Sequence, residues 1–100
     1  MAVAYNVVRM KVKAGKEKEF LDKQRSMGRN IAGTQKVVMI KTGDRTYCII
    51  GEWDKFQSLV NARPALIRAL DGVRDLLEDL GGGLGVTDPV SGEVVLDLKA

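Results

Sequence analysis

Residues 35–53 constrain the fold most, because they predict a β-hairpin. The segment 35–41 is rich in β-branched side chains, and residues 46–53 return as a second strand. The TGDR stretch between them predicts a turn in which Gly43 supplies permissive backbone angles. A hairpin places its two strands antiparallel and adjacent in one sheet. The segments on either side of residues 35–53 must therefore extend that sheet or cover it.

The segment before the hairpin predicts a strand at residues 4–12 and a helix at residues 16–30. Apolar residues alternate along the strand, and Gly15 allows a tight turn after it. One face of the helix repeats at helical spacing, with Phe20, Gln24, Met27 and Ile31 in line. This half of the chain therefore predicts a β-α-β-β order.

The segment after the hairpin predicts two further helices and a last strand. A short helix begins with Asp54 as its N-cap and closes near Arg63, because the proline that follows disfavours helix in the preceding residue. A second helix covers residues 64–80, and the glycine cluster GGGLG ends it. The remainder predicts a short strand, a turn at residues 88–92 and a strand at residues 94–98.

This order of elements is that of the ferredoxin-like split βαβ arrangement. We therefore predict the α+β class: a βαββαβ fold with an extra C-terminal strand, in which both helices lie on one face of an antiparallel sheet. A length of 100 residues suits one domain, and no repeat or linker divides residues 1–100.

Both faces of the predicted sheet carry large apolar side chains. In the first strand Tyr5 and Val7 alternate with Val8 and Met10, and the strand 46–53 is apolar on both sides as well. Such a sheet is normally buried on both faces. The helices cover one face, and a second copy of the chain is the simplest cover for the other. We therefore expect a homodimer, with the strand 94–98 available to reach across to the partner.

Composition excludes several kinds of site. The chain has no histidine, which excludes a His-ligated metal, a haem with a proximal His and a His general base. The single Cys48 allows neither an internal disulfide nor a structural zinc site. We expect neither a metal nor a cofactor. No apolar run approaches the roughly 20 residues of a membrane span, and no signal-peptide pattern is present, so we expect a cytoplasmic chain with no membrane partner.

Charge is distributed unevenly along the chain. Residues 1–50 carry 11 basic and 4 acidic side chains, whereas residues 51–100 carry 5 and 9. Basic and acidic residues nevertheless alternate in KEKEFLDKQR, and nucleic-acid-binding arms are typically blocks of one sign. We interpret the two halves as solvated surfaces of opposite charge and expect no nucleic-acid partner.

Three stretches resemble the antibiotic biosynthesis monooxygenase (ABM) domains of the dimeric α/β-barrel superfamily. They are YNVVRMKVKAGKEKEFLDK, YCIIGEWDKFQSLVNARP and LGVTDPVSGEVV, and together they span most of the chain. The resemblance implies a dimeric α/β barrel and a cofactor-independent monooxygenase acting on a phenolic or quinol-type aromatic small molecule. Haem-degrading relatives use a Trp and a His in the second helical region, where this chain has Val60, Asn61 and Ala62 and no histidine. Haem degradation is therefore not expected.

Asn6 is the candidate catalytic residue. It shares one side of its strand with Val8, Met10 and Val12, so its amide is expected in an otherwise apolar interior. A buried amide without a partner costs about 1–3 kcal/mol and needs a hydrogen bond or a ligand. In the family that this chain resembles, an Asn of the first strand commonly points into the pocket, where its NH₂ group would stabilise a phenolate or a peroxy adduct. The alternative is a structural amide paired with backbone or a buried water.

Five other residues are candidates for substrate binding: Trp53, Tyr47, Tyr5, Met27 and Met39. Each has a structural alternative, because buried tryptophans and tyrosines usually anchor a core or satisfy a backbone group, and methionines usually fill gaps. The same pocket would serve a non-catalytic small-molecule-binding module, and a filled pocket would leave a structural dimeric module. These alternatives remain open at the level of sequence.

Overall fold

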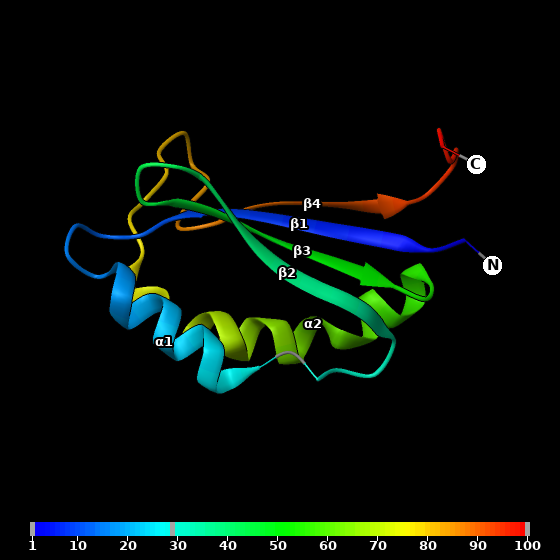
Figure 1. Cartoon of the computed structure of the whole chain (residues 1–100), viewed down its shortest axis with the longest axis horizontal. Coiled ribbons are helices and arrows are strands. Elements are labelled where there is room, and N and C mark those ends of the chain that lie inside the picture. Colours follow the sequence, from blue (N-terminus) through cyan, green and yellow to red (C-terminus); the bar gives the residue numbers. More distant parts are fainter. Residues whose placement is uncertain (1, 29, 100) are drawn as a thin grey trace.

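The computed structural model describes residues 2–28 and 30–99. Its elements are β1 (Ala4–Lys11), α1 (Glu17–Met27), β2 (Thr34–Gly43), β3 (Thr46–Trp53), α2 (Phe56–Asp71), a 3₁₀ helix η1 (Arg74–Leu76) and β4 (Asp88–Glu93). The four strands form an antiparallel sheet in the order β2-β3-β1-β4. Both α-helices lie on the same face of that sheet (Figure 1). The prediction of an α+β, ferredoxin-like fold is therefore confirmed.

The hairpin between β2 and β3 turns within the predicted TGDR stretch, but the predicted role of Gly43 is wrong, because Gly43 belongs to β2 and the turn is formed by residues 44 and 45. Its turn contains Arg45, which takes a left-handed backbone conformation with φ of +55°. The Arg45 guanidinium donates a hydrogen bond to the Val12 carbonyl at 2.9 Å and forms an ion pair with Glu78. These contacts tie the turn to the end of β1 and to the segment after η1, and they compensate the unfavourable backbone of a residue with a Cβ.

The predicted helix break at Pro64 is wrong, because α2 continues through the proline. Pro64 lacks the N–H for the carbonyl one turn earlier, and its ring crowds that carbonyl, so its place inside a helix is unfavourable by itself. Packing of one helix face on both sides of the proline offsets this cost. Leu59 and Ala62 precede it in one core cluster, and Leu66 follows it and packs against that cluster. The predicted helix at residues 64–80 is replaced by the second half of α2 and by η1.

Both helices also differ from their predicted ends. Asp54, predicted as an N-cap, instead accepts a hydrogen bond from the Ser58 hydroxyl at 2.6 Å, and α2 begins two residues after it. Helix α1 ends at Gly28, whose φ of +65° is accessible to glycine at no steric cost.

In the described part of the chain, no helix combines the length and apolarity needed to cross a membrane.

The C-terminal region differs most from its prediction. Residues 88–92 do not form a turn but belong to β4, which pairs with β1 along its whole length. Pro89 is compatible with this position because β4 is an edge strand. The ladder closes where the Val94 N–H donates to the Val3 carbonyl at 2.8 Å. The predicted strand at 94–98 is not formed, and the apolar side chains that follow the ladder are exposed: Val95, Leu96 and Leu98.

The core between sheet and helices is divided into two groups of buried side chains. The Phe20 cluster contains Met10, Val12, Phe20, Tyr47, Val73, Leu76 and Leu77. The Trp53 cluster lies toward the other end of β1 and contains Ala4, Trp53, Leu59 and Ala62. Between them, Asn6, Val8 and Ile49 of β1 and β3 are only half-buried. The interior is therefore incompletely filled over the middle of the sheet.

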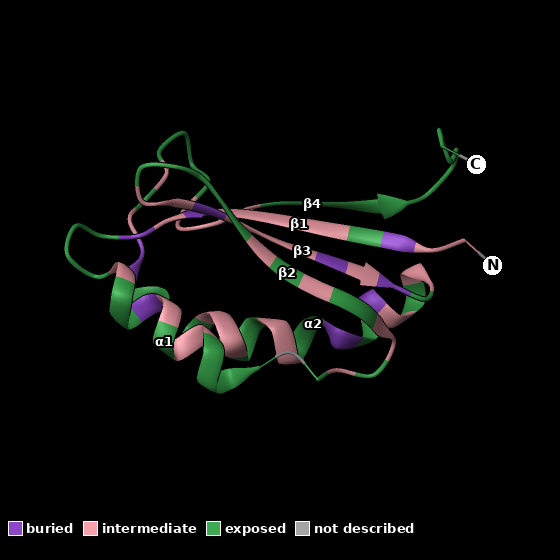
Figure 2. Cartoon of the chain, viewed as in Figure 1, coloured by how far each residue is buried: buried purple, intermediate pink, exposed green. Residues whose placement is uncertain are grey.

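The face of the sheet away from the helices is uncovered in this chain and has an apolar middle, bordered by polar side chains such as Arg9 and Glu52. The register places six apolar side chains from all four strands on it: Val7, Val38, Ile40, Cys48, Ile50 and Val90. The two edge strands, β2 and β4, carry exposed stretches (Figure 2), and Val90 keeps 63% of its surface exposed. Apolar side chains on both faces of the sheet were predicted from the alternation in β1 and β3, and the structure confirms them.

Candidate functional site

A cavity of about 400 Å³ lies between α2 and the sheet, in the gap between the Phe20 and Trp53 clusters. Most of its wall is apolar, including Val8 and Ile49 from the sheet and Leu59, Leu66 and Leu70 from α2. The polar lining residues are Asn6, Gln24, Thr87 and Ser91, with Arg63 as the charged member among the described residues. A concave apolar site of this size with a few polar groups is typical of small-molecule sites, which measure roughly 300–1,000 Å³.

The Asn6 amide forms the polar part of the cavity floor. Its Oδ1 accepts a hydrogen bond from the Trp53 Nε1–H at 2.8 Å. The indole nitrogen is a donor only, so this bond fixes which end of the amide faces Trp53. No hydrogen bond from the Asn6 NH₂ group to another described residue is present. The amide thus satisfies the buried indole with its oxygen and keeps its donor end for the cavity.

Gly51 makes the bond between Asn6 and Trp53 possible. It pairs with Asn6 across the β1–β3 ladder. A Cβ added at Gly51 would lie 2.4 Å from Asn6 Oδ1 and 3.0 Å from Trp53 Nε1. Because these distances are too short for real side chains, only glycine leaves room for the hydrogen bond at this place in β3.

The cavity is closed on its inner side and open at the edge of the sheet. Three of its lining residues are at most 3% exposed: Met10 and Val73 of the Phe20 cluster, and Leu59 of the Trp53 cluster. The exposed lining residues belong to α2 and β4, and they include Arg63, Ile67 and Ser91. The mouth therefore lies between α2 and the edge strand β4.

Of the residues that the sequence suggested for substrate binding, Trp53 lies at the site without lining the cavity. It is 1% exposed and contacts the site through its hydrogen bond to Asn6. Met39 packs against the Phe20 cluster, and Met27 lies close to Gly72. Neither methionine lines the cavity. Trp53 is thus positioned to orient Asn6, whereas the two methionines lie elsewhere on the helix-covered side.

The Tyr47 hydroxyl is already used inside the protein. Tyr47 is buried in the Phe20 cluster, with its ring centroid 5.5 Å from that of Phe20. Its hydroxyl donates a hydrogen bond to Glu17, whose carboxylate also lies 3.0 Å from the Lys41 ammonium. The hydrogen bond to Glu17 is the main cause that raises the pKa of Tyr47, and together with Lys41 it lowers the pKa of Glu17. Tyr47 does not line the cavity.

Tyr5 points to the opposite face of the sheet, as expected for a neighbour of Asn6 on the same strand. Its hydroxyl donates a hydrogen bond to Glu52, which raises the pKa of Tyr5. The structure therefore brings Asn6 and Trp53 together at the cavity and leaves Tyr5, Tyr47, Met27 and Met39 away from it.

Sequence reasoning missed the wall contributed by α2. Leu59, Arg63, Leu66 and Leu70 follow one another at helical spacing on one face. Ending a helix at Arg63 hid this pattern, because it assigned the two halves of the face to different helices. Reading residues 56–71 as one periodic segment would have placed Arg63 beside the apolar side chains of the wall.

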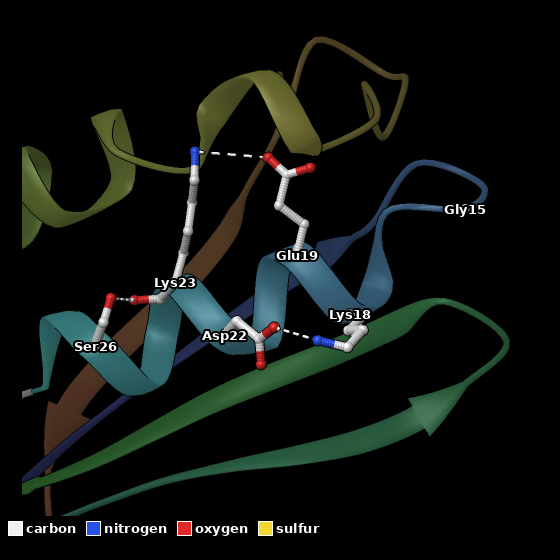
Figure 3. Close-up of a pocket in the computed structure, with 6 residues that line it drawn as sticks. All are labelled: Gly15, Lys18, Glu19, Asp22, Lys23 and Ser26. Carbon is white, nitrogen blue, oxygen red and sulfur yellow. Dashed lines mark hydrogen bonds and ion pairs between the residues drawn. The ribbon is translucent and has the colours of Figure 1, made fainter.

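A second depression, on the outer surface of α1, has a different character (Figure 3). Its side chains pair with one another along the helix: Lys18 with Asp22 at 2.8 Å and Lys23 with Glu19 at 3.8 Å. The Ser26 hydroxyl donates to the Lys23 carbonyl. These are exposed ion pairs one helical turn apart, which are common on helix surfaces, and they leave few polar groups for a ligand. We therefore take the cavity under α2 as the candidate functional site.

Comparison by sequence finds no matching family model and no matching curated protein. Comparison by structure finds several similar folds. A protein from Deinococcus radiodurans, provisionally named an antibiotic biosynthesis monooxygenase, has a TM-score of 0.76 at 11% identity, covering 97% of both chains. One from Chloroflexus aurantiacus with the same provisional name has a TM-score of 0.71 at 13% identity, covering 96% of both.

A protein of unknown function from Nitrosomonas europaea is similar to the same degree. It has a TM-score of 0.73 at 18% identity, over 97% of this chain and 93% of that one. At such identities the likeness shows a shared fold. It agrees with the resemblance to ABM domains suggested by the sequence stretches above.

Proposed function

We propose that this chain is an ABM-like domain, formed by residues 1–100, that oxidises a phenolic or quinol-type aromatic molecule without a cofactor. The observation that carries the proposal is the apolar cavity with the Asn6 amide on its floor, oriented by Trp53. The fold shared with proteins provisionally named antibiotic biosynthesis monooxygenases supports it. Because a fold hosts many functions, the chemistry of the cavity is the main argument.

The proposed reaction uses the electrons of the substrate itself. An ionised phenol passes one electron to O₂, and the two radicals combine to form a C–O bond at a ring carbon that carries hydrogen. The resulting hydroperoxide loses water across that carbon and leaves a quinone. One phenol and one O₂ thus give one quinone and one water, with no external reductant. The described lining residues include no carboxylate, so water at the mouth takes the phenol proton and returns a proton to the peroxide anion once the C–O bond has formed.

Asn6 has the role of an anion-stabilising donor in this scheme. Negative charge develops on the phenolate oxygen and on the peroxide, and the Asn6 NH₂ group is the donor on the floor beneath them. A donor that is fixed before the reaction stabilises such charge most in a site that excludes water. Trp53 is a positioning residue, because its hydrogen bond to Oδ1 turns the NH₂ group toward the cavity.

The decisive experiment measures oxygen uptake with a naphthol and a naphthohydroquinone, above their spontaneous oxidation. The wild-type protein is expected to consume one O₂ per quinone formed from the naphthol, unaffected by a chelator. Asn6→Asp keeps an acceptor for Trp53 but removes the donor, and a loss of about 10²–10³-fold in rate is expected. Glu93→Gln, on the exposed end of β4, is the matched control and should leave the rate unchanged.

Two outcomes would contradict the proposal in different ways. If Asn6→Asp retained the wild-type rate, Asn6 would have no part in catalysis. If both aromatics bound the cavity without oxygen uptake above background, the chain would be a non-catalytic small-molecule-binding module. In that case the same geometry, with its amide donor and apolar wall, would serve recognition alone.

We also propose that two copies of the chain pair through their open sheet faces. Support comes from the six apolar side chains on that face, of which Val38, Ile40 and Val90 are more than a third exposed. A face of this kind is uncommon on a monomer, and two sheets stacked about 10 Å apart would bury it. Ile40→Lys is expected to give a monomer by analytical ultracentrifugation, whereas Leu84→Lys in the glycine-rich loop should leave a dimer. A monomeric wild-type protein at micromolar concentration would contradict the proposal.

A further inference from the structure

The arginine at the mouth of the cavity has no side-chain partner in the part of the chain that the structure describes. Arg63 lines the cavity and is exposed, and its guanidinium makes no ion pair or hydrogen bond with another described residue. Four other arginines of the described chain pair with carboxylates: Arg9, Arg25, Arg45 and Arg74. Among the described residues, Arg63 is thus a cation on the rim of an apolar cavity whose donors are not used by another side chain.

We propose that the cavity takes an aromatic ring that carries an oxyanion substituent, and that Arg63 binds that substituent at the mouth. This inference rests on the proposed function for the aromatic ring and on Arg63 for the charge. The planar guanidinium presents paired N–H groups that match a carboxylate or a sulfonate, which gives direction as well as attraction. Arg63 would therefore select ligands by charge, in addition to the hydrogen bond that Asn6 donates.

The position of Arg63 also sets the orientation of such a ligand. An ionised group deep in an apolar cavity would lose its hydration without compensation, whereas at the mouth it stays partly in water. Met10 and Val73, which line the cavity where it meets the Phe20 cluster, are apolar and at most 2% exposed. The ring therefore enters with its uncharged part first, and its phenolic oxygen lies toward Asn6 while its oxyanion stays beside Arg63.

The test uses two fluorescent probes that differ by one charged group. 8-Anilinonaphthalene-1-sulfonate carries a sulfonate, and N-phenyl-1-naphthylamine is the same ring system without it. Arg63→Gln is expected to weaken binding of the sulfonate about tenfold and to leave the affinity for the neutral probe unchanged. Arg68→Gln is the matched control, because Arg68 is an exposed arginine of α2 that does not line the cavity. It should change neither affinity.

Three results would overturn the proposal. If Arg63→Gln and Arg68→Gln weakened binding of the sulfonate probe equally, the probe would be held by general attraction to a basic surface. Equal weakening of both probes by Arg63→Gln would indicate a packing role for the side chain. Failure of the sulfonate to displace the neutral probe from the wild-type protein would place the two probes at different sites.

The test is independent of turnover, so it separates this inference from the proposed function. Sulfonate binding that depends on Arg63, with no oxygen uptake on any phenol, would reject the enzyme and keep the anion site. Oxygen uptake on a neutral naphthol at equal rates in wild type and Arg63→Gln, with no difference in probe binding, would keep the enzyme and reject the anion site.

Discussion

The Phe20 cluster and the Trp53 end of the interior differ in how completely their polar groups are hydrogen-bonded. In the Phe20 cluster the Tyr47 hydroxyl is paired with Glu17, and aromatic and aliphatic side chains fill the space around it. Near Trp53 only the oxygen of the Asn6 amide is hydrogen-bonded to a described side chain, and a cavity remains beside the amide. Both groups lie on the helix-facing side of adjacent strands. The difference indicates how to recognise a candidate binding site in a core: a polar group marks one where a donor or acceptor of that group has no protein partner and faces a cavity.

The largest expected effect lies in the packed region. Phe20 has no exposed surface and fills the centre of its cluster. Phe20→Ala should destabilise the fold by about 3–5 kcal/mol, because it removes buried apolar area and leaves a hole that its neighbours fill only partly. Urea denaturation monitored by circular dichroism measures the loss. A loss below about 1 kcal/mol would show that this region is not the tightly packed half of the interior.

The next largest effect concerns the glycine beside the cavity floor. Gly51→Ala places a methyl group against Asn6 Oδ1 and Trp53 Nε1, so it should break their hydrogen bond and strain β3. We expect a loss of about 2–4 kcal/mol, from overpacking and from a buried indole N–H without an acceptor. Unfolding curves measure the loss, and the fluorescence of the single tryptophan reports the changed surroundings of Trp53.

A double-mutant cycle sharpens this prediction. Asn6→Ala removes both the acceptor and the nearest atom that a methyl group at Gly51 would meet, and leaves the Trp53 indole as the remaining close neighbour. Gly51→Ala should therefore cost at least 1 kcal/mol less in the Asn6→Ala background than in wild type. Additive losses would mean that the glycine is needed for another reason.

A matched pair of valines on the first strand and its extension compares the two regions directly. Val12 is fully buried in the Phe20 cluster, and Val8 is half-buried at the wall of the cavity. Val12→Ala should lower the free energy of unfolding by about 2 kcal/mol. Val8→Ala should lower it by about 1 kcal/mol or less, because Val8 already lacks neighbours on one side. Equal losses in chemical denaturation would indicate that the cavity is filled in solution.

The smallest expected effect is a dependence on pH in the packed region. The pKa of Glu17 is lowered in the folded chain by its bonds to Tyr47 and Lys41, so the unfolded chain takes up its proton at higher pH. The contribution of Glu17 to stability is therefore complete above its ordinary pKa of about 4.3 and is lost as pH falls through the lower folded value. Urea midpoints of wild type and Glu17→Gln should differ at pH 6 and converge toward pH 3.

The exposed Glu93 provides a control substitution. It forms no ion pair or hydrogen bond with its side chain among the described residues, so Glu93→Gln should leave the urea midpoint at pH 6 close to that of wild type. A Glu17→Gln difference that stayed constant between pH 6 and pH 3 would show that the Tyr47 and Lys41 contacts do not persist in solution.

Local signals in the sequence predicted the elements up to β3, and the alternation in β1 predicted which way Asn6 points. The same alternation places Tyr5 on the other face, so its proposed part in the site conflicted with the register from the start. The wall formed by α2 was not predictable from the local preference at Pro64, because burial on both sides of the proline overrides that preference. Arg63 was missed for the same reason. Strand β4 was missed because its sequence shows no apolar alternation and contains a proline.

The cavity floor depends on three residues together: Asn6, Gly51 and Trp53. Exchange of any one of them alone should disrupt the hydrogen bond or the space that it needs. A chain that lost the amide at position 6 would be free to gain a side chain at position 51, and a chain that lost the indole would no longer need an acceptor beneath it. Among distantly related sequences the three positions should accordingly change in concert. Their joint presence is a compact signature for recognising chains that share this cavity floor, even where overall identity is too low to align them with assurance.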